Sequence, residues 1–247
     1  MPRWSRCDGR RWLGRAVAMG FLLASACAST PATPPGGEGA VAEREQPVAS
    51  EDAATSPPEA SSYLEPNYGE TGYAHVTEAD MPWRIAIAYP RNSPKYGSRR
   101  DARNAALDGM RLWQTAIQEH VPWFELEFVL EDPKAPVQIE WKRRTTGSAQ
   151  GRAGYVCDVV DGKRRIGGRM EIAIRASPTS QPLGVPEVRL LVAHEFGHVL
   201  GLGHCLECDS AMNYAWHTQE RILVTPTDIR TFLELLAEPN RCQGEAG

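Results

Sequence analysis

Three histidines fall within residues 194–204, which read HEFGHVLGLGH, and this segment constrains the fold more than any other. His194 and His198 are four residues apart, so on an α-helix both imidazoles project from one face and can reach one metal ion. A straight helix would carry His204 away from that ion. Because Gly201 lacks a Cβ, it can adopt the left-handed conformation that ends a helix and lets the chain turn back. The spacing therefore predicts three histidine ligands for one ion.

Glu195 follows the first histidine and is rotated away from the direction of the ligands. Its carboxylate is therefore expected to face a water molecule on the metal rather than the metal itself. Three protein ligands leave the fourth position of a tetrahedral zinc ion open, which is typical of catalytic and not of structural zinc. The segment thus predicts a hydrolase with one catalytic zinc ion and Glu195 as its general base.

Hydrophobic periodicity outlines an α+β domain around this segment. The predicted strands are residues 83–89, 124–130, 137–141 and 170–174. The predicted helices are residues 100–119, a metal-binding helix from Pro186 to Leu200, and a last helix capped at Thr225–Asp228. No helix or strand is predicted for the glycine-rich residues 147–168.

The full pattern HExxHxxGxxH resembles the signature of the metzincin metallopeptidases. The order strand, helix, three strands, metal helix and final helix is similar to the matrixin type of metzincin over residues 82–237. This resemblance implies a twisted mixed sheet with an active-site helix, a backing helix and a C-terminal helix. It also implies that the strand around residues 170–175 borders the cleft, where an extended substrate could add to the edge of the sheet.

Residues 210–214, reading SAMNY, extend the resemblance. Met212 stands eight residues after His204, close to matrixin spacing, which implies a methionine turn that forms an apolar floor beneath the histidines. Tyr214 resembles the tyrosine with which astacins and serralysins contact zinc or the transition state, and a tyrosine that packs under the loop is the alternative. Cys205 departs from matrixins, which typically have serine at that position.

Residues 1–26 have the composition of a bacterial export signal, with five arginines before a short apolar run. That run is too short to span a bilayer comfortably. Cys27 directly follows Ala24-Ser25-Ala26, so the segment resembles a lipoprotein signal in which Cys27 receives the lipid. Ala24 departs from the usual leucine, and simple secretion is the alternative. Either route predicts an exported protein, anchored to a bacterial membrane by lipid or else periplasmic or secreted.

Residues 27–62 are rich in proline, alanine, glutamate and serine and cannot bury a core. We interpret them as a flexible tether to a metzincin-like catalytic domain, residues 63–247. A propeptide is the alternative, although the matrixin segment PRCGxPD does not occur in the sequence. Without residues 1–26 the formal net charge falls from −4 to −8, because five arginines and one aspartate leave. Since no basic stripe appears, the sequence predicts no nucleic-acid partner.

The cysteines predict disulfides in an oxidising compartment. If Cys27 carries a lipid, Cys157, Cys205, Cys208 and Cys242 remain and allow three pairings. Cys205 and Cys208 can close a small loop, which would leave Cys157 with Cys242. A metal site or redox pair formed by Cys205 and Cys208 is the alternative.

These features predict a monomeric zinc endopeptidase that hydrolyses protein or peptide substrates. The resemblance also allows a calcium ion through Asp158 or Asp161, whereas the lack of histidine in residues 142–170 argues against a second zinc site. Two other functions stay open. One is a non-catalytic zinc-containing lipoprotein that serves as a binding module, and the other is a hydrolase of a cell-wall peptide amide.

Overall fold

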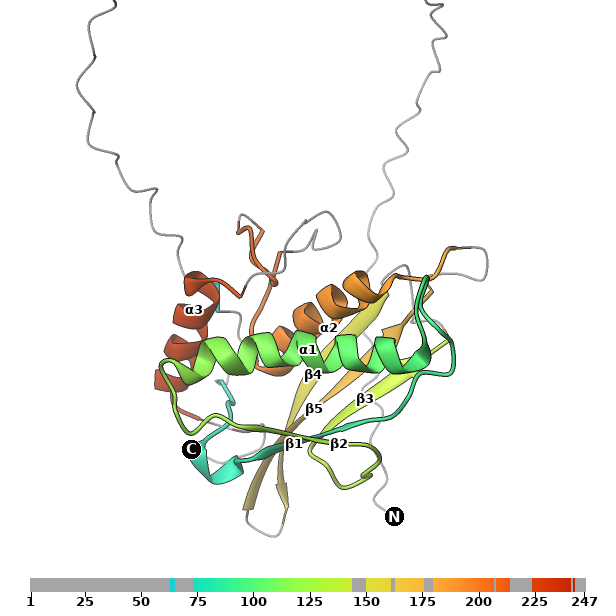
Figure 1. Ribbon diagram of the computed structural model, residues 1–247. Coiled ribbons are helices and arrows are strands. Elements are labelled where there is room, and N and C mark those ends of the chain that lie inside the picture. Colours follow the sequence, from blue (N-terminus) through green and yellow to red (C-terminus); the bar gives the residue numbers. More distant parts are fainter. Residues whose placement is uncertain are drawn as a thin grey trace, which may run out of the picture. The chain divides into compact units, whose positions relative to one another are not determined.

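A computed structural model describes residues 63–64, 73–143, 150–160, 163–175, 180–206, 208–213, 224–240 and 242. These residues form a five-stranded mixed sheet and three α-helices (Figure 1). The strands are β1 (Trp83–Ile87), β2 (Leu126–Val129), β3 (Val137–Lys142), β4 (Gly151–Val160) and β5 (Lys163–Ala173). The helices are α1 (Arg99–Gln118), α2 (Val185–Val199) and α3 (Pro226–Ala237), and the short 3-10 helix η2 (Glu78–Asp80) precedes β1. The predicted α+β class is confirmed.

Helix α1 begins where its capping residues satisfy the first backbone amides. The Ser98 hydroxyl accepts a hydrogen bond from the backbone of Asp101 at 3.1 Å, and the Asp101 carboxylate accepts one from the backbone of Ser98 at 2.7 Å. Apolar residues then recur every three or four positions and bury one stripe of the helix. The stripe includes Ala106, Met110, Trp113 and Ile117, all fully buried. This agrees with the predicted amphipathic helix.

The order of strands in the sheet is β2-β1-β3-β5-β4. Strand β1 pairs in parallel with both β2 and β3, and β3 pairs in parallel with β5. Strand β4 is antiparallel to β5 and occupies the edge of the described sheet. The sheet is therefore mixed, and one antiparallel edge strand lies beside the helix that carries the histidines.

The glycine-rich stretch is where the sequence-based prediction of strands is wrong. It contains β4 and the first half of β5, which pair from Gly151 with Ile172 to Val160 with Lys163. Four strands, not three, therefore follow α1. Consequently the strand that includes residues 170–173 does not border the cleft, because it is paired on both sides, and β4 takes the edge. Glycines and charged residues weaken the intrinsic strand preference of this stretch, and pairing between distant residues overrides it.

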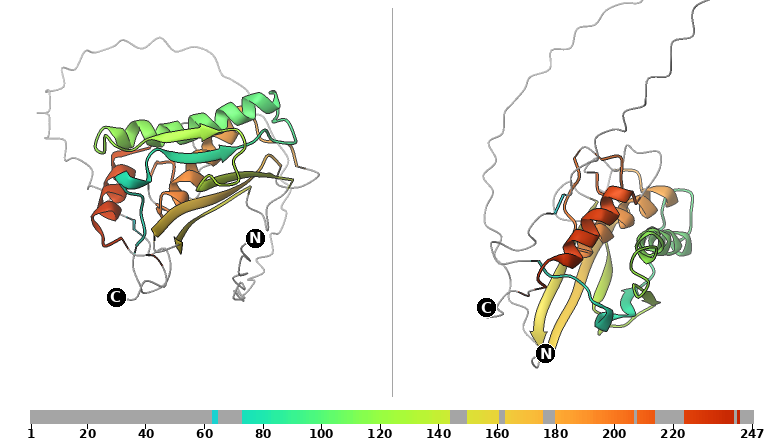
Figure 2. Two further views of the ribbon diagram at one scale, coloured as in Figure 1. Left: turned by 90° about the horizontal axis from the view of Figure 1, so that it is seen from below. Right: turned by 90° about the vertical axis from the view of Figure 1, so that its left-hand side faces the viewer.

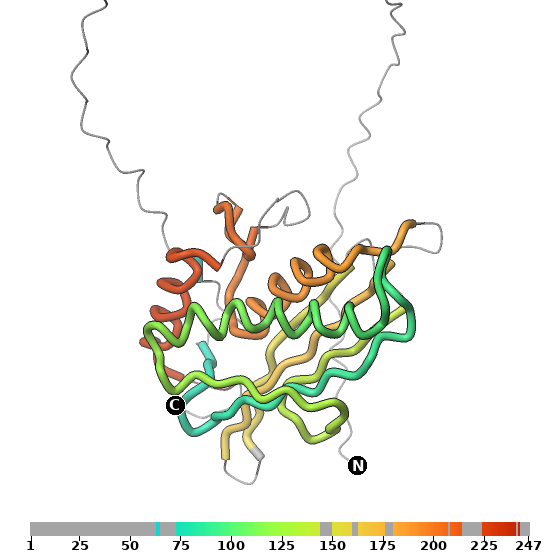
Figure 3. Tube along the Cα trace, viewed as in Figure 1, coloured from blue at the N-terminus to red at the C-terminus, as the bar shows by residue number. Residues whose placement is uncertain are grey.

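Helix α2 contacts α1 on one side and strands β4 and β5 on the other. Figures 2 and 3 show α1 and α2 crossing the sheet, with the chain leaving α2 directly into the loop of residues 200–206. From α1, Nε1 of Trp113 donates a hydrogen bond to the carbonyl of Ala193 at 2.8 Å. From the sheet, the ring of Trp83 packs 6.1 Å from the ring of Phe196. Because α2 is held from both sides, its last two turns have a fixed position.

Candidate metal centre

The side chains of His194, His198 and His204 converge on one point. Helix α2 supplies the first two, and Gly201, with φ of 98°, ends the helical turn and returns the chain so that His204 faces them. The ligand nitrogens all lie within 4.8 Å of one another, and the Nε2 atoms of His198 and His204 are 3.2 Å apart. Within the described part of the chain this is the only group of three or more His, Cys, Asp or Glu residues that could hold a metal ion. The predicted histidine cluster is confirmed.

Backbone carbonyls orient the two helical imidazoles. Nδ1 of His194 lies 2.8 Å from the carbonyl oxygen of Ala211, and Nδ1 of His198 lies 2.8 Å from that of Leu202. An imidazole that donates its Nδ1 proton to a carbonyl presents the Nε2 lone pair to a metal. Burial lowers the pKa of His194 to about 3 and that of His198 to about 4, so both rings are neutral at pH 7. Two neutral imidazoles and a third ring that converges with them fit a zinc ion.

Glu195 is buried beside this cluster, with 6% of its surface exposed. Burial raises the pKa of its carboxyl group to about 8 in the metal-free protein, and the positive charge of Arg152 on β4 acts against that shift. The carboxyl group lies against Gly151, the first residue of β4, where an added Cβ would overlap Oε1. A group with this pKa and this position can accept or release a proton near pH 7.

Met212 lies under the end of α2 and is fully buried. Its sulfur packs so closely on Gly197 that a Cβ at this glycine would overlap Sδ and would lie 2.9 Å from Cζ2 of Trp113. The backbone amide of Met212 donates to the hydroxyl of Ser210 at 3.1 Å, and its carbonyl accepts from the amide of Cys205 at 3.0 Å. The turn that holds Met212 is thereby bonded to the residue that follows the third histidine.

A buried aspartate joins this turn to α3. Asp228 accepts hydrogen bonds from the backbone amide and hydroxyl of Thr225, at 2.6 Å and 2.9 Å, and from the side chains of Tyr63 and Ser210. Burial raises the pKa of Asp228, and these donors act against the shift. Burial, together with the negative charge of Asp228, raises the pKa of Tyr63. Asp228 therefore fixes Ser210, and with it the turn beneath the histidines, to the helix.

Sequence reasoning found Asp228 only as a helix-capping residue, and it missed Gly151. The threonine three positions before Asp228 signalled the cap, but nothing nearby signalled Ser210 or Tyr63 as further partners. Gly151 had no signal, because its importance comes from a contact with a residue 44 positions later.

Two disulfides are present, Cys157–Cys242 and Cys205–Cys208. The first joins β4 to the C-terminal segment, and the second closes a three-residue separation directly after His204. Disulfides form and persist outside the cytoplasm, so the protein is an exported one. Within the described residues, no helix is both long and apolar enough to cross a membrane.

Several predicted site residues lie outside the described residues. They are Cys27, Asp161 and Tyr214. The roles proposed for them in lipid attachment, calcium binding and contact with zinc or the transition state stay predictions. Asp158 is described and lies exposed on β4.

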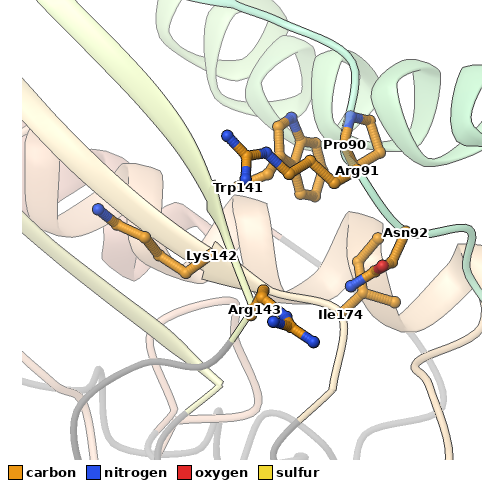
Figure 4. A pocket seen from close by; sticks show the side chains of 7 residues that line it. All are labelled: Pro90, Arg91, Asn92, Trp141, Lys142, Arg143 and Ile174. Carbon is orange, nitrogen blue, oxygen red and sulfur yellow. The ribbon is translucent and has the colours of Figure 1, made fainter.

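A separate pocket lies where β1, β3 and β5 end (Figure 4). Its lining residues are Pro90, Arg91, Asn92, Trp141, Lys142, Arg143 and Ile174. Lys142 is already paired with Glu140 at 2.5 Å and with Glu171 at 3.2 Å. The lining contains none of the three histidines, so this pocket is distinct from the histidine cluster.

Comparison with known proteins agrees with the geometry. A family model described as matrixin matches residues 75–236. This range includes the whole sheet, α1, α2, the histidine cluster and all but the last residue of α3. No curated protein matches the chain.

Proposed function

Because the chain belongs to the matrixin family of zinc metallopeptidases, we propose that it is a zinc-dependent endopeptidase with Glu195 as general base. The observation that carries this proposal is the placement of a buried carboxyl group beside three convergent imidazoles. His194, His198 and His204 would hold the zinc ion, and a tetrahedral ion with three protein ligands would keep its fourth position for water or substrate.

When bound, zinc would lower the pKa of a water molecule to about 7 and polarise the substrate carbonyl. Glu195 would take a proton from the attacking water and would pass it to the leaving amine. Burial raises the pKa of the Glu195 carboxyl group above its ordinary value, which makes the carboxylate a stronger proton acceptor. The carbonyls of Ala211 and Leu202 keep two imidazoles in the required orientation throughout.

We propose that an extended substrate binds along the edge of β4. This strand begins at Gly151, beside Glu195, and only one of its sides is paired within the described sheet. An extended peptide could add to the other side through backbone hydrogen bonds, which would bring a carbonyl toward the metal. Because binding through backbone hydrogen bonds along a strand edge needs no free terminus of the peptide, it favours cleavage within a chain.

We further propose that the catalytic domain is residues 63–247 and that it works outside the cytoplasm as a monomer. The proposed location follows from three predicted features, namely the export signal of residues 1–26, the lipid on Cys27 and the tether of residues 27–62. The oxidised cysteines support export. A lipid on Cys27 would keep the domain within the length of its tether from a membrane.

The decisive experiment compares the wild type with Glu195→Gln on casein and on a peptide library. We expect the wild type to cleave internal bonds and to stop when zinc is chelated. The E195Q variant should bind zinc equally well and cleave nothing. Equal cleavage by both forms would contradict the role of Glu195. Zinc binding without cleavage by the wild type would favour the binding module, and cleavage restricted to cell-wall peptides would favour the amide hydrolase.

A further inference from the structure

We propose that the disulfide between Cys205 and Cys208 is a positioning device for the third metal ligand. It acts on His204, which it follows directly, and it sets how tightly the centre holds zinc. The inference rests on the assignment of His204 as a ligand and goes beyond the proposed peptidase activity, because it concerns how the ligand is kept in place.

His204 is supported differently from the other two histidines. His194 and His198 belong to α2 and are fixed by helical hydrogen bonds and by the packing of α2 between α1 and the sheet. His204 follows Gly201 on non-helical backbone and is only partly buried. Its position therefore depends on bonds of the backbone before it, such as that from the Leu202 amide to the Gly197 carbonyl at 3.0 Å, and on the segment that comes after it.

That segment is a closed loop tied at several points. The amide of Cys205 donates to the carbonyl of Met212 at 3.0 Å. The Asn213 side chain donates to the carbonyl of Cys208 at 2.6 Å, and its amide donates to the carbonyl of Ser210 at 3.1 Å. The disulfide closes the remaining gap. Because the residues that carry these bonds also include the turn beneath the histidines, the loop connects the third ligand to the floor of the site.

The disulfide joins two buried cysteines on either side of an exposed residue. Leu206, between the two cysteines, is 75% exposed, so it contributes little apolar burial. The two cysteines are themselves buried at 8% exposure each and belong to the hydrophobic core. The covalent link ties these two core residues to each other and thereby restricts the backbone that directly follows His204.

The other disulfide provides a matched comparison. Cys157–Cys242 spans 85 residues, whereas Cys205–Cys208 spans three. A longer loop loses more entropy on crosslinking, so the long-range disulfide should stabilise the fold more. Cys157 also lies six residues along β4 from Gly151, roughly 20 Å at strand spacing, toward the end away from Glu195. In this proposal Cys157–Cys242 mainly stabilises the fold, and Cys205–Cys208 positions His204.

The experiment uses the full exported chain with two double variants, C205S/C208S and C157S/C242S. The zinc dissociation constant is measured by competition with a chelator, Co²⁺ absorption reports the ligand geometry, and thermal unfolding is measured on the metal-free forms. We expect C205S/C208S to bind zinc roughly 10- to 100-fold more weakly and to change the Co²⁺ spectrum, with little change in the metal-free Tm. The variant C157S/C242S should show the reverse, namely a lower metal-free Tm with zinc affinity close to wild type.

Equal zinc affinity in C205S/C208S and the wild type would overturn the proposal. A C205S/C208S chain that no longer folds without metal would also overturn it, because the link would then hold the domain and not the ligand. Since zinc affinity and not cleavage is measured, a wild-type protein that binds zinc but cuts no peptide would contradict the proposed peptidase function alone.

Discussion

The carboxyl group of Glu195 lies against the backbone of Gly151, so closely that a Cβ on this glycine would overlap Oε1. Glu195 lies in the C-terminal part of α2, and Gly151 is the first residue of the edge strand β4. The contact therefore positions Glu195, the proposed base, relative to β4, the strand proposed to bind substrate.

Gly151→Ala tests this relationship. The added methyl group should displace the Glu195 carboxylate by about 1 Å and lower kcat by roughly 100-fold, because a proton acceptor at the wrong distance cannot serve the reaction. Zinc affinity should change little, since the atoms nearest to the added methyl group all belong to Glu195 and none to a histidine. Gly154→Ala, three residues along the same strand, is the control, because a Cβ there meets nothing within 4 Å. Wild-type turnover in G151A would show that this contact does not position the base.

The contact between Gly197 and Met212 predicts a second steric effect. In Gly197→Ala the new methyl group would overlap Sδ of Met212 and crowd Trp113, so the metal-free domain should lose about 1–3 kcal/mol of unfolding free energy. Met212→Ala alone should cost about 2–5 kcal/mol, because it leaves a cavity. In the double variant the two losses should be less than additive, since the alanine at 212 makes room for the one at 197. Strict additivity in urea unfolding would contradict the contact.

Removal of the Asp228 carboxylate should lower the free energy of unfolding without changing any of the three histidine ligands. Asp228→Ala leaves the buried donors of Thr225, Tyr63 and Ser210 unsatisfied, so we expect a loss of about 2–4 kcal/mol in denaturant unfolding. Tyr63→Phe removes one donor and should cost about 1 kcal/mol. Similar losses in the two variants would show that Asp228 acts only through Tyr63.

The pKa values of the helical histidines predict how the metal-free protein responds to acid. His198 has a pKa of about 4 when folded, against about 6.5 when unfolded. Its neutral form therefore contributes stability that is present above pH 6.5 and is lost as pH falls toward 4, by up to about 1.4 kcal/mol per pH unit. Glu195, whose pKa is raised, changes stability in the opposite direction over this range.

The comparison that isolates this histidine uses His198→Asn, with chelator present throughout. Below pH 6.5 the stability of the wild type should fall more steeply than that of the variant, because Glu195 is common to both. Parallel stability curves between pH 4 and 6.5 would show that His198 is not buried in its neutral form.

The sequence was informative where short spacing determines geometry. The four-residue interval between His194 and His198 and the flexible Gly201 are enough to place three imidazoles together, and capping residues placed the starts of α1 and α3. Strand β4 could not be found in this way, because its glycines disfavour a strand and its structure comes from pairing with β5. The roles of Gly151 and Asp228 likewise depend on partners far away in the sequence, which local patterns do not reveal.

The origin of all three ligands in eleven consecutive residues has a consequence for the order of folding. A chain that crosses a membrane unfolded carries the whole ligand set on a short loop, whose closure costs little entropy. It can therefore capture zinc before the sheet forms, whereas the surroundings of Glu195 must wait for β4 to arrive. We therefore expect metal capture to precede catalytic competence. Any affinity of the unfolded chain for zinc would make the ion stabilise the native domain less than its dissociation constant alone indicates.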